Sequence, residues 1–196
     1  MMKKFLLAIL AAFMMIGGAA VDANAQNEFY PPSIGLNFGL GCGTVNHSIN
    51  QWNNIFVPSF EFAGDYSFLP NIINVNGSIS GGLYFGIGSG SRKEFNSHYQ
   101  KDVKYTDFCW RGGTRGALHY SWVRNLDTYA GIAIGVKHQS FKADISEIHD
   151  ETKTDLDYFG FAGVRYKLTH GFSFYSEVAS SHQAWFQIGV SVLINN

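Results

Sequence analysis

The chain has 196 residues, of which only 15% are charged, against about 25% in an average soluble domain. Its formal net charge is −1 and no long basic stripe occurs, which argues against nucleic acid as a partner. Aromatic residues make up 16% of the chain and glycine occurs 22 times. The length suffices for one domain with a sizeable core.

The first element along the chain has the pattern of a secretory signal peptide over residues 1–25. MMKK gives a positive start, an apolar run follows from Phe5 to Val21, and Ala23-Asn24-Ala25 offers a cleavage site. An uncleaved membrane helix is the alternative, but the run is at the short end of the spanning range. We therefore expect an exported mature chain over residues 26–196. No later apolar run reaches about 18 residues, so a membrane-bound mature chain must be a closed barrel.

The mature chain shows apolar and polar residues in alternation, which is typical of strands. In the segment FVPSFEFAGDYSF, Phe60 and Phe62 alternate with Glu61, and Tyr66 follows Asp65. A strand sends alternate residues to opposite faces, so the aromatics and carboxylates are separated. The same pattern predicts eight strands, at 33–43, 56–68, 72–88, 107–122, 126–137, 156–168, 172–179 and 184–194.

The connections alternate in length. Tight links are expected at Pro70-Asn71, near Asn125–Asp127 and at Thr169–Gly171, and longer polar loops at 44–54, 89–104 and 138–154, with a short link at 180–183. This layout is typical of an outer-membrane barrel whose long loops face outward. An even strand number places both termini at the rim with the short turns.

Barrel size decides which face points inward. An eight-stranded barrel has room only for a filled interior, so the large aromatic set is expected to face lipid and the small polar set the lumen. A secreted, soluble ligand carrier with the faces reversed is the alternative. We predict an all-β fold: an eight-stranded, antiparallel, up-and-down transmembrane β-barrel.

The lumen-facing set carries acids and bases in near balance. Buried charges are tolerated when they are paired, so we expect a salt-bridge network that plugs the barrel, with Arg165 opposite Tyr175 and within reach of Glu177. The predicted network comprises Glu61, Asp65, Arg111, Arg115, His119, Lys137, Asp157, Arg165, Lys167 and Glu177.

These features resemble the outer-membrane protein β-barrel domain family, in particular small barrels of the OmpA/OmpX type, over residues 33–194. The resemblance implies an outer-membrane location, with outer-membrane lipid, lipopolysaccharide and the barrel insertion machinery as partners. The chain departs from many members by ending Leu193-Ile194-Asn195-Asn196 rather than on an aromatic residue.

The predicted function is structural or interactive rather than enzymatic, with a surface ligand expected at loops 44–54, 89–104 and 138–154. The basic loop 89–104 either touches lipopolysaccharide phosphates or is a solvated face. The acidic residues of 138–154 are interpreted as a solvated hairpin extension, because they lack a metal-binding loop pattern. No cofactor is expected.

The alternative is an outer-membrane enzyme that modifies lipid A. Its candidate residues are His47-Ser48, or Glu177 with Ser181-His182. Cys42 and Cys109 are expected to be unpaired thiols, with a disulfide as the alternative.

Overall fold

The computed structural model describes residues 33–46, 54–72, 76–97, 100–145, 150–169, 171–181 and 183–195. The predicted signal peptide lies outside these residues. Within them, no helix is long and apolar enough to cross a membrane. The described chain forms eight strands: β1 (Ser33–Asn46), β2 (Asn54–Pro70), β3 (Gly77–Asn96), β4 (Lys101–Val123), β5 (Leu126–Ala143), β6 (Glu151–Thr169), β7 (Phe172–Ala179) and β8 (Phe186–Asn195).

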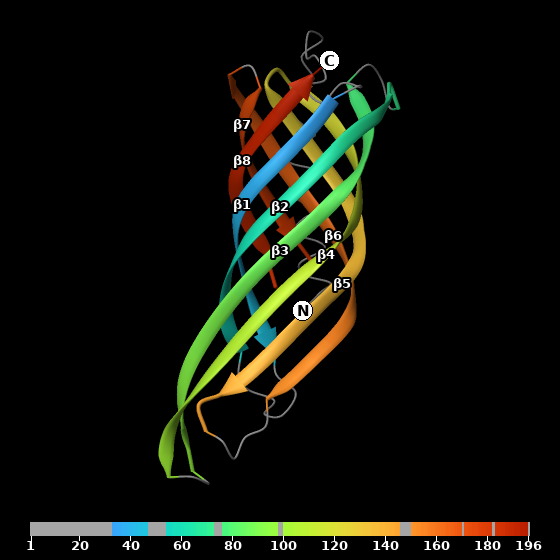
Figure 1. Ribbon diagram of the computed structural model, residues 1–196. Coiled ribbons are helices and arrows are strands. Elements are labelled where there is room, and N and C mark those ends of the chain that lie inside the picture. Colours follow the sequence, from blue (N-terminus) through green and yellow to red (C-terminus); the bar gives the residue numbers. More distant parts are fainter. Residues whose placement is uncertain are drawn as a thin grey trace.

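The strands close into one antiparallel barrel in chain order, as Figure 1 shows. Closure occurs between β1 and β8, whose register runs from Ser33 opposite Asn195 to Cys42 opposite Phe186. The start of β1 and the end of β8 therefore share one rim. The predicted eight-stranded, up-and-down barrel is confirmed.

The same rim carries the tight connections. The β4–β5 turn is Arg124–Asn125, and Asn125 has a φ of 67°. Gly171, between β6 and β7, has a φ of 81°, a left-handed conformation that glycine adopts without strain. The predicted Pro70-Asn71 turn is wrong in length, because β2 ends at Pro70 and β3 begins only at Gly77. Asp127 is also not a turn residue, since it lies within β5.

The opposite rim differs most from the predicted layout, because much of the expected loops is strand. β3 and β4 stay paired through Asn96 opposite Lys101, so the loop predicted at 89–104 is a hairpin. The loop predicted at 138–154 is shorter than expected, because β5 continues to Ala143 and β6 begins at Glu151. The loop predicted at 44–54 shortens in the same way, and its centre, 47–53, lies outside the described residues.

The β3–β4 hairpin projects beyond the barrel wall. Pairing between β2 and β3 stops at Ser59 opposite Gly88, after which β3 has a free edge. Pro58 is the next residue of β2, and a proline in a sheet is tolerated beside such an edge. We call residues 89–96 of β3 and 101–108 of β4 the extension; it is the long hairpin at the bottom of Figure 1.

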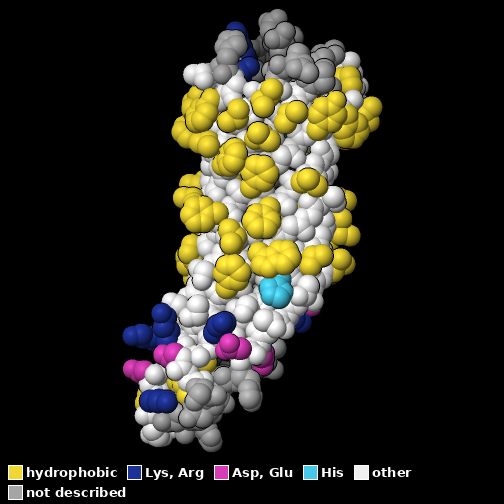
Figure 2. Space-filling model, in the orientation of Figure 1, with side chains coloured by type: hydrophobic (Ala, Val, Ile, Leu, Met, Phe, Trp, Pro, Cys, Tyr) yellow, Lys and Arg dark blue, Asp and Glu magenta, His cyan; other side chains and the backbone are white. Residues whose placement is uncertain are grey.

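Exposed apolar side chains of all eight strands form a belt on the outer face of the barrel, and Figure 2 shows one side of this belt in yellow. Ile132 and Tyr158 are 75% and 76% exposed, whereas Glu61 and Asp65 are buried in the lumen. The predicted assignment of faces is confirmed for most of each strand. It fails at the start of the last predicted strand, where Ala184 is buried and Trp185 exposed, because β8 begins only at Phe186.

The barrel is thus the inverse of a soluble domain, with its polar groups inside and its apolar side chains outside. Only a closed barrel or a helix satisfies all its backbone groups within lipid. The fold is that of a transmembrane barrel of the outer-membrane type.

Candidate functional site: a charged network inside the barrel

The lumen brings together most of the charged residues predicted to lie there. Lys137 and Lys167 are partly exposed, so the structure does not place them in the buried set. The remaining eight are all buried: Glu61, Asp65, Arg111, Arg115, His119, Asp157, Arg165 and Glu177.

Arg111 organises the tier of the network nearest the extension. Its Nη2 donates to Glu61 Oε2 at 3.0 Å, and its Nη1 donates to Ser181 Oγ at 2.6 Å. Asp157 Oδ2 lies 3.9 Å from the same Nη1 and accepts a hydrogen bond from the Tyr84 hydroxyl at 3.0 Å. One guanidinium therefore joins β4 to the opposite side of the barrel.

Arg115 forms the middle tier, between two carboxylates. Its Nε lies 3.1 Å from Asp65 Oδ1, and its Nη2 donates to Glu177 Oε2 at 2.9 Å. Glu177 also accepts from the Gln187 side-chain amide. Both carboxylates are buried and face the same guanidinium group.

Arg165 forms the tier nearest the turns. Its Nη1 donates to Asp127 Oδ2 at 3.2 Å and its Nη2 to Asn37 Oδ1 at 3.1 Å. Asn37 Nδ2 then donates to Asp65 Oδ2 at 3.2 Å, which links this tier to that of Arg115. The register puts Arg165 opposite Tyr175 as predicted, but its ion-pair partner is Asp127 rather than Glu177.

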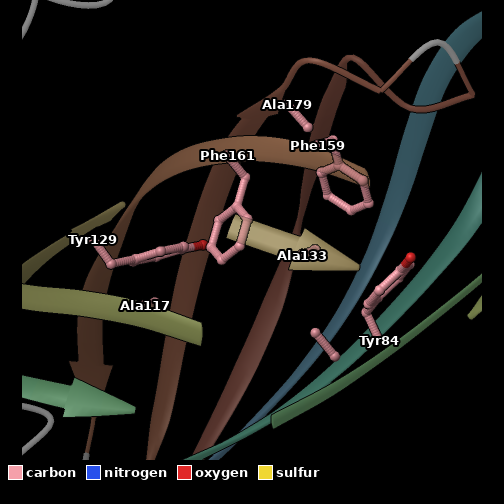
Figure 3. Packing of buried hydrophobic residues seen from close by; sticks show 8 residues of the cluster. Tyr84, Ala117, Tyr129, Ala133, Phe159, Phe161 and Ala179 are labelled. Carbon is pink, nitrogen blue, oxygen red and sulfur yellow. The ribbon is translucent and has the colours of Figure 1, made fainter. Parts of the chain in front are cut away.

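Aromatic rings fill the lumen between the arginines. Figure 3 shows the rings of Tyr84, Tyr129, Phe159 and Phe161 pointing into the interior from three strands. The Arg111 guanidinium lies 4.7 Å from the Phe159 ring centroid, and that of Arg115 lies 3.9 Å from Phe161. Stacking on a ring suits the planar, weakly hydrated guanidinium.

Inward-facing glycines make room for these large groups. A Cβ added at Gly163 would lie 2.5 Å from Cζ of Tyr129, and one at Gly131 would lie 2.7 Å from Cζ of Phe161. A Cβ at Gly86 would collide with the Glu61 carboxylate. The glycine-rich inner face therefore leaves room for the large side chains that lie directly opposite on the neighbouring strands.

Sequence reasoning missed part of the site. Asp127 was assigned to a turn, although its position two residues before the lumen-facing Tyr129 was an available signal. With Asp127 included, the network has five carboxylates, three guanidinium groups and His119. The buried part of the network therefore holds more carboxylates than guanidinium groups.

His119 joins three strands through both ring nitrogens. Its Nδ1 lies 2.9 Å from Asp127 Oδ2 and its Nε2 lies 2.9 Å from Ser80 Oγ. This is the bonding order of a Ser-His-Asp triad. Ser80 is buried, however, and Asp127 also pairs with Arg165, so the group is continuous with the charge network.

Of the residues considered for a lipid A enzyme, Glu177 and Ser181 lie within the described part of the chain. Ser181 accepts a hydrogen bond from Arg111, and Glu177 is held by Arg115. His47, Ser48 and His182 lie outside the described residues.

The described residues contain no group of three or more His, Cys, Asp or Glu side chains arranged to hold a metal ion. Both cysteines are free thiols. Cys109 is buried on the lumen side, whereas Cys42 continues the lipid-facing series of Phe38 and Leu40, so the barrel wall separates them.

Asp107 is a second buried carboxylate site, located in the extension outside the apolar belt. Its side chain is 1% exposed, and Oδ1 has no hydrogen-bond partner among the described residues. It faces Phe141 across the strands, beside an apolar cluster that includes Val57 and Cys109. Burial raises the pKa of Asp107 from 3.8 to about 6.

No protein-family model and no curated protein matches the chain. Ail, the attachment invasion locus protein of Yersinia pestis, is a solved structure of similar fold, with 12% identity and a TM-score of 0.49 over 83% of this chain and 95% of Ail. Neisserial surface protein A has 12% identity and a TM-score of 0.41 over 81% and 96% of the two chains. The N-terminal barrel of Pseudomonas aeruginosa OprF has 12% identity and a TM-score of 0.41 over 87% of this chain and 100% of the OprF barrel. The similarity concerns the fold alone.

Proposed function

We propose that the protein is a non-enzymatic barrel of the Gram-negative outer membrane that contributes to envelope structure and displays the extension at the cell surface. The observation that carries this proposal is the buried network of Arg111, Arg115 and Arg165, which crosses the lumen in three tiers. Such an interior supports a sealed barrel rather than an aqueous channel, as expected for eight strands.

The proposed orientation follows from the two rims. Tight turns and both ends of the barrel share one rim, and the extension lies at the other. In outer-membrane barrels short turns face the periplasm and long hairpins face outward. Residues 1–25 are proposed to act as the export signal.

The experiment combines heat-modifiable gel mobility with surface proteolysis of intact cells. The folded, detergent-extracted barrel should migrate differently from the boiled protein. Protease should cut near the tip of the extension, around Gln100, and spare the Arg124–Asn125 turn. Cleavage of intact cells at that turn, or a single mobility with and without heating, would contradict the proposal.

A lipid A–modifying enzyme is the second candidate, favoured by the hydrogen-bond chain from Ser80 through His119 to Asp127. A working triad needs an accessible nucleophile, and Ser80 is buried. We therefore expect no labelling of Ser80 by a fluorophosphonate probe. We also expect the same lipid A acyl pattern, by mass spectrometry, in deletion and overexpression strains. Labelling that Ser80→Ala abolishes, or a changed acyl pattern, would favour the enzyme.

A soluble ligand carrier fits the structure least well. Its exterior would have to expose the apolar belt to water, including Phe60 and Ile132, which are 70% and 75% exposed. Recovery of the protein in the aqueous fraction without detergent would be the result expected of a carrier.

A further inference from the structure

We propose that the open edge of β6, residues 152–158, binds an extended segment of a partner protein as an added β-strand at the level of the apolar belt. The segment carries apolar residues in alternation with small uncharged ones. The proposal goes beyond the function proposed above, because it rests on the barrel wall and not on the displayed extension.

The β7–β8 hairpin is too short to complete the outer part of the barrel wall. β7 pairs with β6 only as far as Ala179 opposite Phe161, and β8 pairs with β1 only as far as Phe186 opposite Cys42. Beyond this row β6 continues, and among the described residues it is paired with β5 alone. Figure 1 shows β6 running on toward the extension, whereas β7 and β8 end short of it. Residues 152–158 of β6 therefore form an open edge.

The backbone groups of the open edge point away from β5. Gly160 shows the direction, because its C=O accepts a hydrogen bond from the Ser180 N–H at 2.9 Å and its N–H donates to Ser180 Oγ at 3.0 Å. Alternate residues of an antiparallel strand direct these groups to the same side, so those of Tyr158 and Leu156 follow Gly160. Within the described part of the chain, neither residue has a backbone partner on that side. Their N–H and C=O groups can therefore pair with an added strand.

The open edge begins at the level of the apolar belt. Tyr158 and Leu156 are themselves exposed apolar residues, and they lie opposite Ile134 and Val136, which belong to the belt on β5. Lipid offers no water to unpaired backbone groups, so an open edge at this level is costly. An added strand removes that cost, and its hydrogen bonds therefore contribute more than they would at an edge in water.

The side chains of the edge define the partner. The outward residues carry no charge and are Thr152, Thr154, Leu156 and Tyr158. An added strand continues this lipid-facing surface, so its own outward residues must be apolar. On the inward side Lys153 lies 2.9 Å from Asp155, and Asp157 accepts a hydrogen bond from the Tyr84 hydroxyl. Because these carboxylates already have partners, small uncharged residues suit the inward positions of the added strand.

The other open edge of the barrel is protected by charge. β3 loses its β2 partner beyond Gly88, but its free segment carries Arg92, Lys93 and Glu94 in succession. Charged residues on an edge strand, lysine above all, prevent the addition of further strands. The outward face of the β6 edge lacks this protection, and the edge directly continues the existing β6–β7 ladder.

A second copy of this chain does not suit the β6 edge. Two copies in one membrane are related by a two-fold axis along the membrane normal, so their β6 strands would run parallel. The same rotation turns the outward face of one copy toward the lumen side of the other. Leu156 and Tyr158 would then be continued by lumen-facing residues. The added strand is therefore assigned to a different protein.

The experiment uses a synthetic peptide as the added strand. Its sequence is that of residues 130–137, AGIAIGVK, which alternates apolar and small residues as the edge requires. It is titrated into the folded barrel in detergent micelles, and the amide signals of Leu156 and Tyr158 are followed by NMR. A peptide of the same composition in a scrambled, non-alternating order is the control for apolar binding.

Two substitutions at one position separate backbone pairing from side-chain contact. Leu156→Pro removes an N–H that points to the open edge and leaves the ladder with β5 intact. It should weaken binding of the alternating peptide by about tenfold, because one hydrogen bond is lost and the proline ring hinders the added strand. Leu156→Ala keeps the N–H and should weaken binding by less than about threefold, because lipid contacts the leucine side chain equally well in the free barrel.

The wild-type barrel should shift the amides of Leu156 and Tyr158 with the alternating peptide and not with the scrambled one. Equal shifts with both peptides, no shift with either, or equal effects of the two substitutions would overturn the proposal. Shifts that depend on protein concentration without peptide would assign the edge to a second copy instead. If Leu156→Pro does not fold, nuclear Overhauser contacts between the peptide and β6 decide the question in the wild type, and their absence counts against strand addition.

Discussion

At the scale of single residues, the interior is explained by how each buried carboxylate is compensated. Glu61 accepts hydrogen bonds from Ser59 and Arg111, whereas Asp65 contacts Asn37 and Arg115. Charges removed from water are tolerated only with such partners. The two carboxylates that stand among the aromatics of β2 are therefore structural groups in two different tiers.

Removal of Arg115 should strongly destabilise the barrel. Arg115→Met leaves Asp65 and Glu177 buried without their shared cation, which should cost about 3–5 kcal/mol. The measurement is the midpoint of urea unfolding in detergent micelles. The control Arg92→Met removes an exposed pair with Glu94 and should cost less than about 1 kcal/mol. Equal midpoints for the two variants would refute a stabilising role for the network.

A single added methyl group should test the packing of the lumen. In Gly163→Ala the new Cβ would lie 2.5 Å from the Tyr129 ring, so we expect a loss of about 1–3 kcal/mol. Gly160→Ala on the same strand is the control, because its Cβ would have no neighbour closer than 3.8 Å. Unfolding midpoints should separate the two variants; a tolerated Gly163→Ala would mean that the lumen is loosely packed.

At the scale of elements, the extension is the feature that distinguishes this barrel wall. β3 and β4 continue past the end of the β2–β3 ladder at Gly88, and the hairpin turns at its tip near Gln100, whose φ is 52°. The base of the extension is held by the apolar contacts of Val57, Cys109 and Phe141. Asp107 lies beside this cluster, so its charge state should affect the base.

The extension should be more stable in acid than at neutral pH. The pKa of Asp107 is about 6 when buried and 3.8 when exposed, so the folded base binds the proton more tightly. Protonation of Asp107 stabilises the extension fully below about pH 3.8, and this stabilisation is lost as the pH rises through about 6. Hydrogen exchange of the extension amides, corrected for intrinsic rates, should show lower protection at pH 7.5 than at pH 5.

Asp107→Asn should remove this pH dependence, because the amide cannot ionise. Asp102→Asn is the matched control on the exposed face of the same strand, and it should leave the dependence in place. Equal protection of the wild-type extension at both pH values would show that the charge state of Asp107 does not affect the stability of the extension.

At the scale of the whole molecule, the inverted distribution of polarity determines where the barrel can exist. The belt removes its apolar surface from water only by contact with lipid, while the three arginine tiers hold the opposite walls together from inside. The outer and inner faces of one strand should therefore respond differently to the same kind of substitution.

A charge on the outer face should impair insertion into the membrane. Phe62 lies in the belt, where its ring centroid is 5.2 Å from that of Phe38. Phe62→Arg places a guanidinium there, which should lower the free energy of unfolding in lipid by about 2–4 kcal/mol. Folding into phospholipid vesicles, followed by heat-modifiable mobility, measures the effect. Glu61→Ala on the inner face should weaken folding less. If both variants folded as well as the wild type, the assignment of faces would be wrong.

The alternating sequence by itself determined the number of strands, the closed barrel and the face of most residues. The reason is physical: one face of each strand must contact lipid, so every second residue of the strand must be apolar or small. The fold class and the lumen position of Glu61, Asp65, Arg111 and Arg115 could therefore be predicted from the alternation along each strand, without knowing which strands pair. The register of Arg165 opposite Tyr175 followed from the turn in the same way.

Only the tertiary structure decided which charges meet. Arg165 pairs with Asp127, which lies directly opposite it on the neighbouring strand β5, while Glu177 on β7 is held by Arg115 from across the lumen. The extension was likewise hidden from sequence, since polar residues such as Arg92 and Lys93 form strands when a partner strand supplies their hydrogen bonds. Pairing between distant segments depends on closure of the whole barrel, and no local pattern encodes it.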